Sequence, residues 1–117
     1  MTVPIYQLKA EFFKTLGHPA RIRVLELLSE GEQSVGQLVP EVGIEASHLS
    51  QQLAILRRAN LVQTRKEGSS VFYSMANAEI SELLAVAKRI LTSSLTASAE
   101  MLAELESEPP APVATKR

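Results

Sequence analysis

The stretch that most constrains the fold of this chain runs from Gly43 to Asn60. Leu49, Leu53 and Leu56 recur in it at helical spacing and define one apolar face. The other faces carry short hydrogen-bonding side chains followed by two arginines: Ser47, His48, Ser50, Gln51, Gln52, Arg57 and Arg58. A helix that enters the DNA major groove needs such a row of small donors and acceptors, with cations placed to meet phosphate. Taken alone, the pattern fits an ordinary amphipathic surface helix equally well, so the neighbouring segments decide between the two interpretations.

A short helix and a turn are predicted directly before this stretch. Ser34 and Gln37 match the capping-box pattern that starts a helix. Val35, Leu38 and Val39 then supply a short apolar face, which ends in the turn-forming segment 40–43. A short helix, a turn and a longer helix in direct succession are typical of a helix-turn-helix.

Beyond Asn60 the sequence changes to β-branched and aromatic residues. Segments 61–66 and 71–75 predict two strands, and the residues between them, which include Gly68, predict the turn of a hairpin. Arg65 and Lys66 place cations on the first strand, where they suit contact with phosphate or the minor groove. A hairpin in this position is a wing, and it favours the DNA interpretation over the surface-helix alternative.

Apolar stripes mark both ends of the expected domain. One helix is predicted over residues 5–16 and another over about 78–106, which would be about 40 Å long at 1.5 Å per residue. We expect both stripes to pair with a second copy of the chain; the candidate interface residues are Ile5, Leu8, Phe12, Leu84, Leu91 and Leu95. For the first helix, packing on the domain's own core is an equally good alternative. For the last helix, an intramolecular bundle is the weaker one.

Length and composition fit one mainly α domain with a small β-hairpin, over residues 1–107, followed by a disordered proline-rich tail over 108–117. No apolar run approaches the roughly 20 residues that a membrane span needs, and no signal peptide is evident, so we expect a cytoplasmic protein. The net charge is −1, but four cations lie within residues 57–66, beside the candidate reading helix.

An enzyme is not expected from this composition. The chain has no cysteine and no aspartate, and its two histidines, His18 and His48, are far apart in the sequence. The usual nucleophile–base pairs and metal hydrolysis sites are hard to assemble from such a set, and no glycine-rich phosphate loop is present. We therefore expect no catalytic residue and no cofactor. His18, at a helix junction, is expected to bond the local backbone.

Three blocks of sequence together resemble the ArsR/SmtB family of bacterial winged-helix repressors: H-P-A-R-I-R-V-L-E-L-L (18–28), S-H-L-S-Q-Q-L-A-I-L-R-R-A-N-L-V (47–62) and G-S-S-V-F-Y-S (68–74). The resemblance implies a homodimer formed by the first and last helices, bound to a pseudo-palindromic operator. It also implies that Ser47, His48, Ser50, Gln51 and Gln52 read DNA and that Arg65 contacts the backbone or minor groove.

The sequence departs from the family at its usual sensing positions. Ser34 and Gly36 stand where the arsenic-sensing branch has a pair of cysteines, and the last helix has none of the histidine and aspartate ligands of the zinc-type branch. We therefore expect no metal site. The effector is then of another kind, or a separate partner protein does the sensing, or there is no effector. A winged helix that serves only as a protein-interaction module is the rival from a different functional class.

Overall fold

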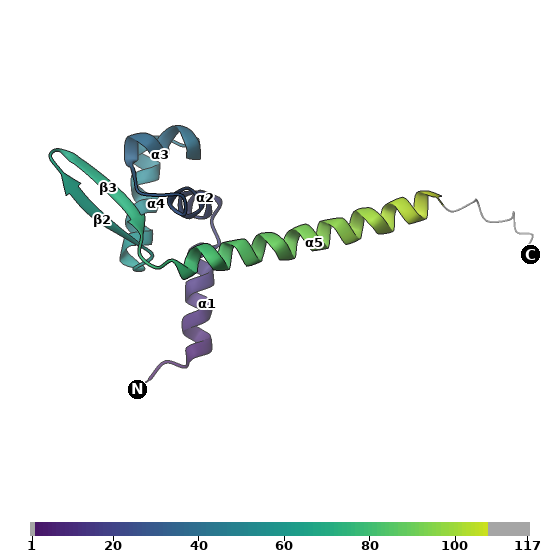
Figure 1. Ribbon diagram of the computed structural model, residues 1–117. Helices are drawn as coiled ribbons and strands as arrows, with labels where there is room; N and C mark the ends of the chain where they lie inside the picture. The colour runs from purple at the N-terminus through teal and green to yellow at the C-terminus, as the bar shows by residue number, and fades with distance from the viewer. Residues whose placement is uncertain (1, 108–117) are drawn as a thin grey trace, which may run out of the picture. The chain divides into compact units, whose positions relative to one another are not determined.

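The computed structural model describes residues 2–107 of the chain. Its elements are, in order, α1 (Ile5–Leu16), α2 (Pro19–Leu28), β1 (Gln33–Ser34), α3 (Val35–Val42), α4 (Ala46–Arg58), β2 (Val62–Glu67), β3 (Ser70–Met75) and α5 (Glu79–Ser107) (Figure 1). These residues fall into two compact units, one up to Leu84 and one from Ala85 onward, so α5 begins in the first unit and continues in the second. The proline-rich tail predicted over residues 108–117 lies outside the described residues.

Side-chain hydrogen bonds mark where α2, α3 and α5 begin. The His18 side chain accepts a hydrogen bond from the Ala20 N–H at 3.2 Å, as expected for a histidine at a helix junction. The predicted capping box of Ser34 and Gln37 is present at the start of α3. Ahead of α5, Asn77 Oδ1 accepts from the Glu79 N–H at 2.9 Å. Each cap satisfies a backbone donor that the first helical turn leaves unpaired.

The sheet has three strands in the order β1-β3-β2, and both pairings are antiparallel. The hairpin of β2 and β3 confirms the predicted wing, with Gly68 at a positive φ of 63° in its turn. The additional strand β1 was not predicted, because two residues are too few to show the alternation that identifies a strand.

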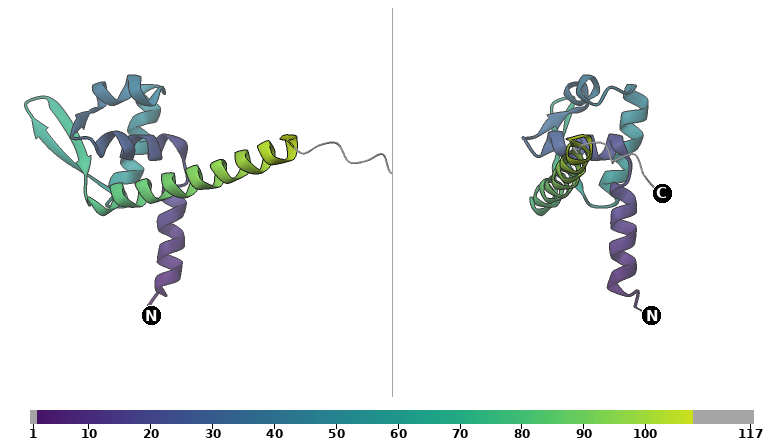
Figure 2. Two further views of the ribbon diagram at one scale, coloured as in Figure 1. Left: turned by 45° about the vertical axis from the view of Figure 1, so that its right-hand side comes forward. Right: turned by 90° about the vertical axis from the view of Figure 1, so that its right-hand side faces the viewer.

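The core of the first unit lies where α2, α3 and α4 gather against the base of the hairpin (Figures 1 and 2). Its completely buried side chains are Val24, Leu25, Leu38, Leu49, Leu53 and Leu56. Burying a leucine or valine side chain is worth about 1.5–3 kcal/mol relative to leaving it exposed, so this cluster fixes how the helices pack. Within the described residues, no helix has the length and apolar character that crossing a membrane requires.

Candidate nucleic-acid interface

One face of α4 is buried and the opposite face is open. Its leucines Leu49, Leu53 and Leu56 have no exposed surface, which confirms the predicted apolar face and fixes which side of the helix points outward. Among the residues predicted to contact DNA, those exposed on this helix are Ser47, His48, Ser50, Gln51 and Arg57. Short side chains allow close approach to base edges, and a glutamine amide can pair with adenine through two hydrogen bonds.

Gln52 does not belong to this open face, and its assignment as a base-reading residue was wrong. The side chain is only 6% exposed, and its Oε1 accepts a hydrogen bond from Arg21 Nε at 2.8 Å. Arg21 also donates from Nη1 to the Thr15 carbonyl at 2.9 Å. Through these two bonds Arg21, on α2, links α4 to the end of α1. A signal for this burial is present in the sequence, since Gln52 lies three residues after Leu49 and four before Leu56, on the apolar stripe.

The two histidines, 30 residues apart in the chain, lie close together. The ring centroids of His18 and His48 are 6.4 Å apart, in an edge-to-face arrangement. His18 Nδ1 accepts from the Ala20 N–H, which leaves Nε2 as its available nitrogen. Among the described residues, no group of three histidine, cysteine, aspartate or glutamate side chains is placed to hold a metal. The proximity of these two rings was not predicted.

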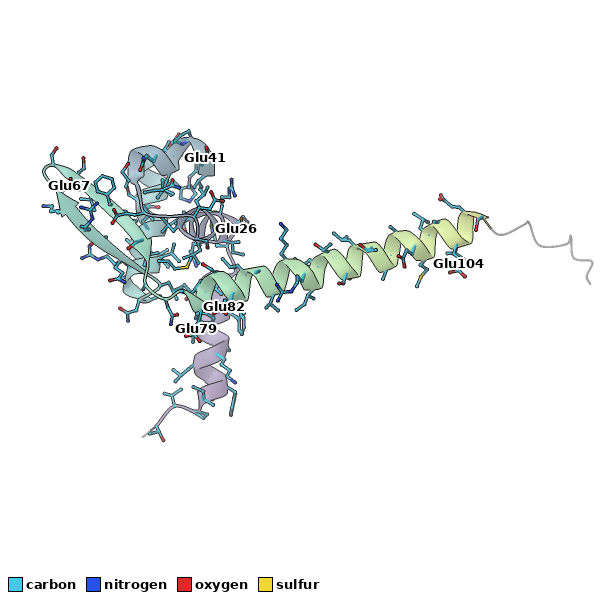
Figure 3. All side chains as sticks on the ribbon, viewed as in Figure 1. Glu26, Glu41, Glu67, Glu79, Glu82 and Glu104 are labelled. Atoms are coloured by element: carbon cyan, nitrogen blue, oxygen red, sulfur yellow. The ribbon has the colours of Figure 1, made fainter. Side chains whose placement is uncertain are left out.

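The two cations of the wing differ in their surroundings. Both are exposed on β2, but Arg65 donates to Glu32 from Nε and Nη2, over 3.0 and 2.6 Å, and to Glu67 from Nη1 over 2.5 Å. The labelled Glu67 lies near the turn of the hairpin (Figure 3). Lys66 makes no ion pair with any described residue. Lys66 is therefore open to phosphate, whereas Arg65 already has anionic partners.

Hydrogen bonding stabilises the charged forms of this cluster. The bonds from Arg65 hold the pKa of the Glu32 carboxyl below its ordinary value. The bonds to Glu32 and then to Glu67 raise the pKa of Arg65. A carboxyl with a lowered pKa remains ionised at neutral pH, and its ion pair is lost only as the pH falls through that lowered value. The interaction between Arg65 and Glu32 is therefore intact at physiological pH.

Large apolar side chains remain exposed on α1 and, separately, on the part of α5 after Leu84. Of the predicted interface residues, Ile5, Leu8, Leu91 and Leu95 are exposed. Phe12 and Leu84 are half-buried and pack on the core of the first unit. For Phe12 this corresponds to the alternative noted for the first helix. Apolar surface of this extent commonly marks a contact with another molecule.

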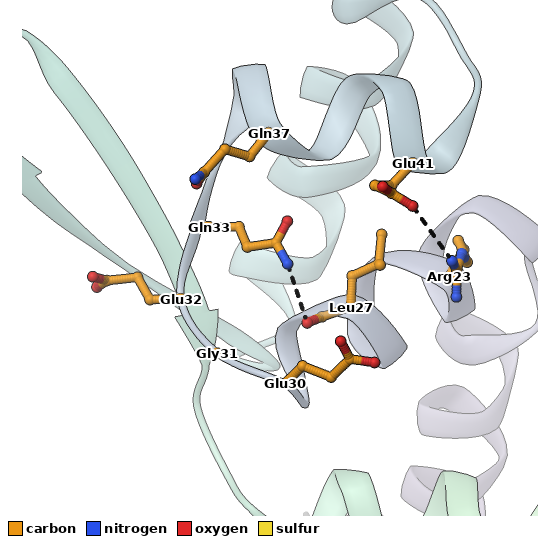
Figure 4. A pocket seen from close by; sticks show the side chains of 8 residues that line it. All are labelled: Arg23, Leu27, Glu30, Gly31, Glu32, Gln33, Gln37 and Glu41. Carbon is orange, nitrogen blue, oxygen red and sulfur yellow. Dashed lines mark hydrogen bonds and ion pairs between the residues drawn. The ribbon is translucent and has the colours of Figure 1, made fainter.

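A groove of about 580 Å³ lies beside the loop that leads into β1 (Figure 4). Its lining residues are Arg23, Leu27, Glu30, Gly31, Glu32, Gln33, Gln37 and Glu41. The carboxylates of Glu30 and Glu32 point to different sides of the loop (Figure 4). These two neighbouring glutamates therefore have different surroundings, although each carries the same charge.

Comparisons with known proteins agree on bacterial transcriptional regulators. A family model described as "Bacterial regulatory protein, arsR family" matches residues 18–64. The chain is 54% identical over 103 residues to Rv0081 of Mycobacterium tuberculosis (strain ATCC 25618 / H37Rv), named an uncharacterized HTH-type transcriptional regulator, across 87% of this chain and 90% of that protein. It is 41% identical over 75 residues to the biofilm growth-associated repressor of Xylella fastidiosa (strain Temecula1 / ATCC 700964), across 64% of this chain and 66% of that protein.

Solved structures agree with the sequence comparison. The crystal structure of M. tuberculosis Rv0081 matches with a TM-score of 0.77 at 55% identity, covering 84% of this chain and 99% of that chain. The homodimeric winged helix-turn-helix DNA-binding domain of Mb0332 from Mycobacterium bovis matches with a TM-score of 0.70 at 26% identity, covering 78% and 84%. The names of these proteins describe regulators rather than enzymes.

Proposed function

The chain belongs to the arsR family of bacterial regulatory proteins, and we propose that it is a homodimeric transcriptional repressor that binds a pseudo-palindromic operator. The observation that carries this proposal is the open polar face of α4, which the buried leucines hold outward. Binding to chromosomal DNA would place the protein in the cytoplasm. We propose no catalytic role.

Side-chain chemistry divides the work of DNA binding between base edges and phosphates. Ser47, His48, Ser50 and Gln51 are proposed to face base edges, because they are exposed on one helix and can donate and accept hydrogen bonds. The proposed phosphate contacts are Arg57, Arg65 and Lys66. Phosphate contacts hold the protein in register on the DNA but carry no sequence information.

A dimer is proposed because one recognition helix reads only half of a palindromic site. The exposed apolar residues of α1 and α5 would form its interface. A two-fold dimer would place its two α4 helices in successive major-groove segments, about 34–36 Å apart, which is one turn of DNA.

A winged helix used only for protein contacts remains the rival, and the pairing of Arg65 with two carboxylates favours it. The discriminating experiment is a titration of labelled duplex DNA with the purified protein at several salt concentrations. A DNA-binding protein releases counterions, so its affinity falls steeply as salt rises. Absence of salt-dependent DNA binding would leave the interaction module as the better proposal.

Arg65→Ala is expected to weaken binding to specific and random DNA alike. Loss of one phosphate contact should reduce the salt slope by about one unit. Fluorescence anisotropy of labelled duplexes over a range of salt measures both quantities. The matched control is Arg23→Ala, which also removes an arginine paired with two glutamates, Glu26 and Glu41, but on α2. A salt slope that does not change in Arg65→Ala would show that the wing contacts no phosphate through this residue.

Zinc, nickel or cobalt at modest excess is expected to change operator affinity by less than about threefold, under about 1 kcal/mol. A metal switch generally needs several ligands with fixed geometry, whereas among the described residues His18 and His48 lie close together without a third such side chain. The measurement is operator anisotropy with and without each metal, repeated with His18→Ala and His48→Ala. A tenfold effect that disappears in either variant would contradict the expectation. A large effect seen only with cell extract would indicate a separate sensing partner.

A further inference from the structure

Arg65 is held by two carboxylates from different parts of the first unit. Glu32 takes two of its hydrogen bonds from the loop before β1, and Glu67 takes the third from the end of β2. The guanidinium carbon lies 4.9 Å from the centroid of the Phe72 ring. One cation and two anions give this cluster a net charge of −1, so Arg65 lies in an anionic environment.

The sheet holds Glu32 in place for this contact. Ser34 on β1 and Arg65 on β2 both pair with Phe72, from opposite sides of β3. Glu32 directly precedes Gln33, which is itself paired with Tyr73. The Arg65 side chain therefore passes over the Phe72 ring to reach Glu32, in the loop directly before the strand on the far side. Strand order builds this contact between residues that are 33 positions apart.

The hydrogen-bond geometry favours competition with DNA over orientation toward it. A guanidinium has five N–H donors on three nitrogens, and here every nitrogen donates to a carboxylate oxygen within 3.0 Å. A phosphate must approach these same nitrogens to roughly 3 Å, which brings it within a few ångströms of the Glu32 carboxylate. Like charges at that separation repel.

We propose that Glu32 sets the DNA affinity of the wing by competing with phosphate for the Arg65 guanidinium. This inference rests on the proposed DNA binding. Arg65 reaches phosphate only when the Glu32 carboxylate releases it. The wild-type wing therefore binds DNA more weakly than it would if Glu32 did not compete for Arg65.

The test compares Glu32→Gln with Glu30→Gln, each made in the wild-type and in the Arg65→Ala background. Both substitutions remove one negative charge from the same loop, but Glu30 points to the other side of it (Figure 4) and makes no ion pair with a described residue. Exposed ion pairs add little stability, so thermal unfolding should show that all variants fold. Binding is measured by anisotropy of a labelled random-sequence duplex over a range of salt, and by the salt that elutes each variant from heparin.

Glu32→Gln is expected to bind the duplex about threefold to tenfold more tightly than Glu30→Gln at every salt concentration, because Arg65 no longer has to leave a carboxylate before it reaches phosphate. In the Arg65→Ala background the two variants should bind equally. Weaker or equal binding by Glu32→Gln, or a difference that persists without Arg65, would overturn the inference. If the wild-type protein binds no duplex, the proposed function fails and this inference fails with it, whereas duplex binding without the expected difference between the two variants overturns the inference alone.

Discussion

Leu91→Glu is expected to leave the protein monomeric at micromolar concentration and to abolish tight operator binding. Leu91 is 62% exposed on α5, within the apolar stripe that we propose as part of the dimer interface. A glutamate there would lie unpaired in an apolar contact, at a cost of several kcal/mol. A monomer contacts one half-site only, so the loss of operator-binding free energy should also be several kcal/mol. Sedimentation measures assembly, and anisotropy measures binding.

Thr96→Glu is the matched control for this substitution. Thr96 is exposed, and it lies five residues further along the same helix, roughly 140° around its axis from Leu91. The substitution Thr96→Glu introduces the same charge outside the apolar stripe, so this variant should remain dimeric. Because neither residue is buried in the single chain, circular dichroism should show both variants folded. A Leu91→Glu protein that stays dimeric and binds operator would refute the proposed arrangement.

Gln51→Ala and Gln52→Ala are expected to have opposite phenotypes, although the residues are adjacent. Gln51 is exposed, so its loss should cost about 1–3 kcal/mol on the specific site and little on random DNA. Its effect on folding should be within about 0.5 kcal/mol. Gln52 is buried against Arg21, and its loss leaves the Arg21 Nε–H without this acceptor, which should reduce the free energy of unfolding by about 1–3 kcal/mol.

Two measurements on each variant separate these roles. Urea unfolding gives the change in stability, and anisotropy with operator and random duplexes gives the change in specificity. Both variants keep the buried Leu49 and Leu53, so a difference between them reflects the glutamine that was replaced. Equal losses of affinity on both duplexes for Gln51→Ala would show that this residue does not read bases.

Local sequence patterns predicted the elements because their causes are local. The caps at Ser34 and Asn77 involve neighbours two or three residues away, and the apolar period of α4 is visible in its own leucines. The wing was predictable for the same reason, since a hairpin joins residues close in the chain. The positions of the helices and of the hairpin therefore follow from short segments.

Contacts between distant segments were not predictable, and they change the candidate site. Arg65 and Glu32 are 33 residues apart, and Arg21 and Gln52 are 31 apart. No periodicity within a segment specifies such a pair, because the order of strands and the packing of helices bring the partners together. The two-residue strand β1 shows this most clearly. Its pairing with β3 places Glu32 beside the wing, and no sequence pattern predicted that pairing.

Footprinting of the purified protein on fragments of its own genome tests whether α4 reads a specific operator. We expect protected sites that contain two inverted half-sites about one helical turn apart. Protection should be lost with Leu91→Glu and altered in sequence preference with Gln51→Ala. Protection that is uniform along the DNA, or absent at every salt concentration where the protein is folded and dimeric, would contradict the claim that α4 reads a specific operator.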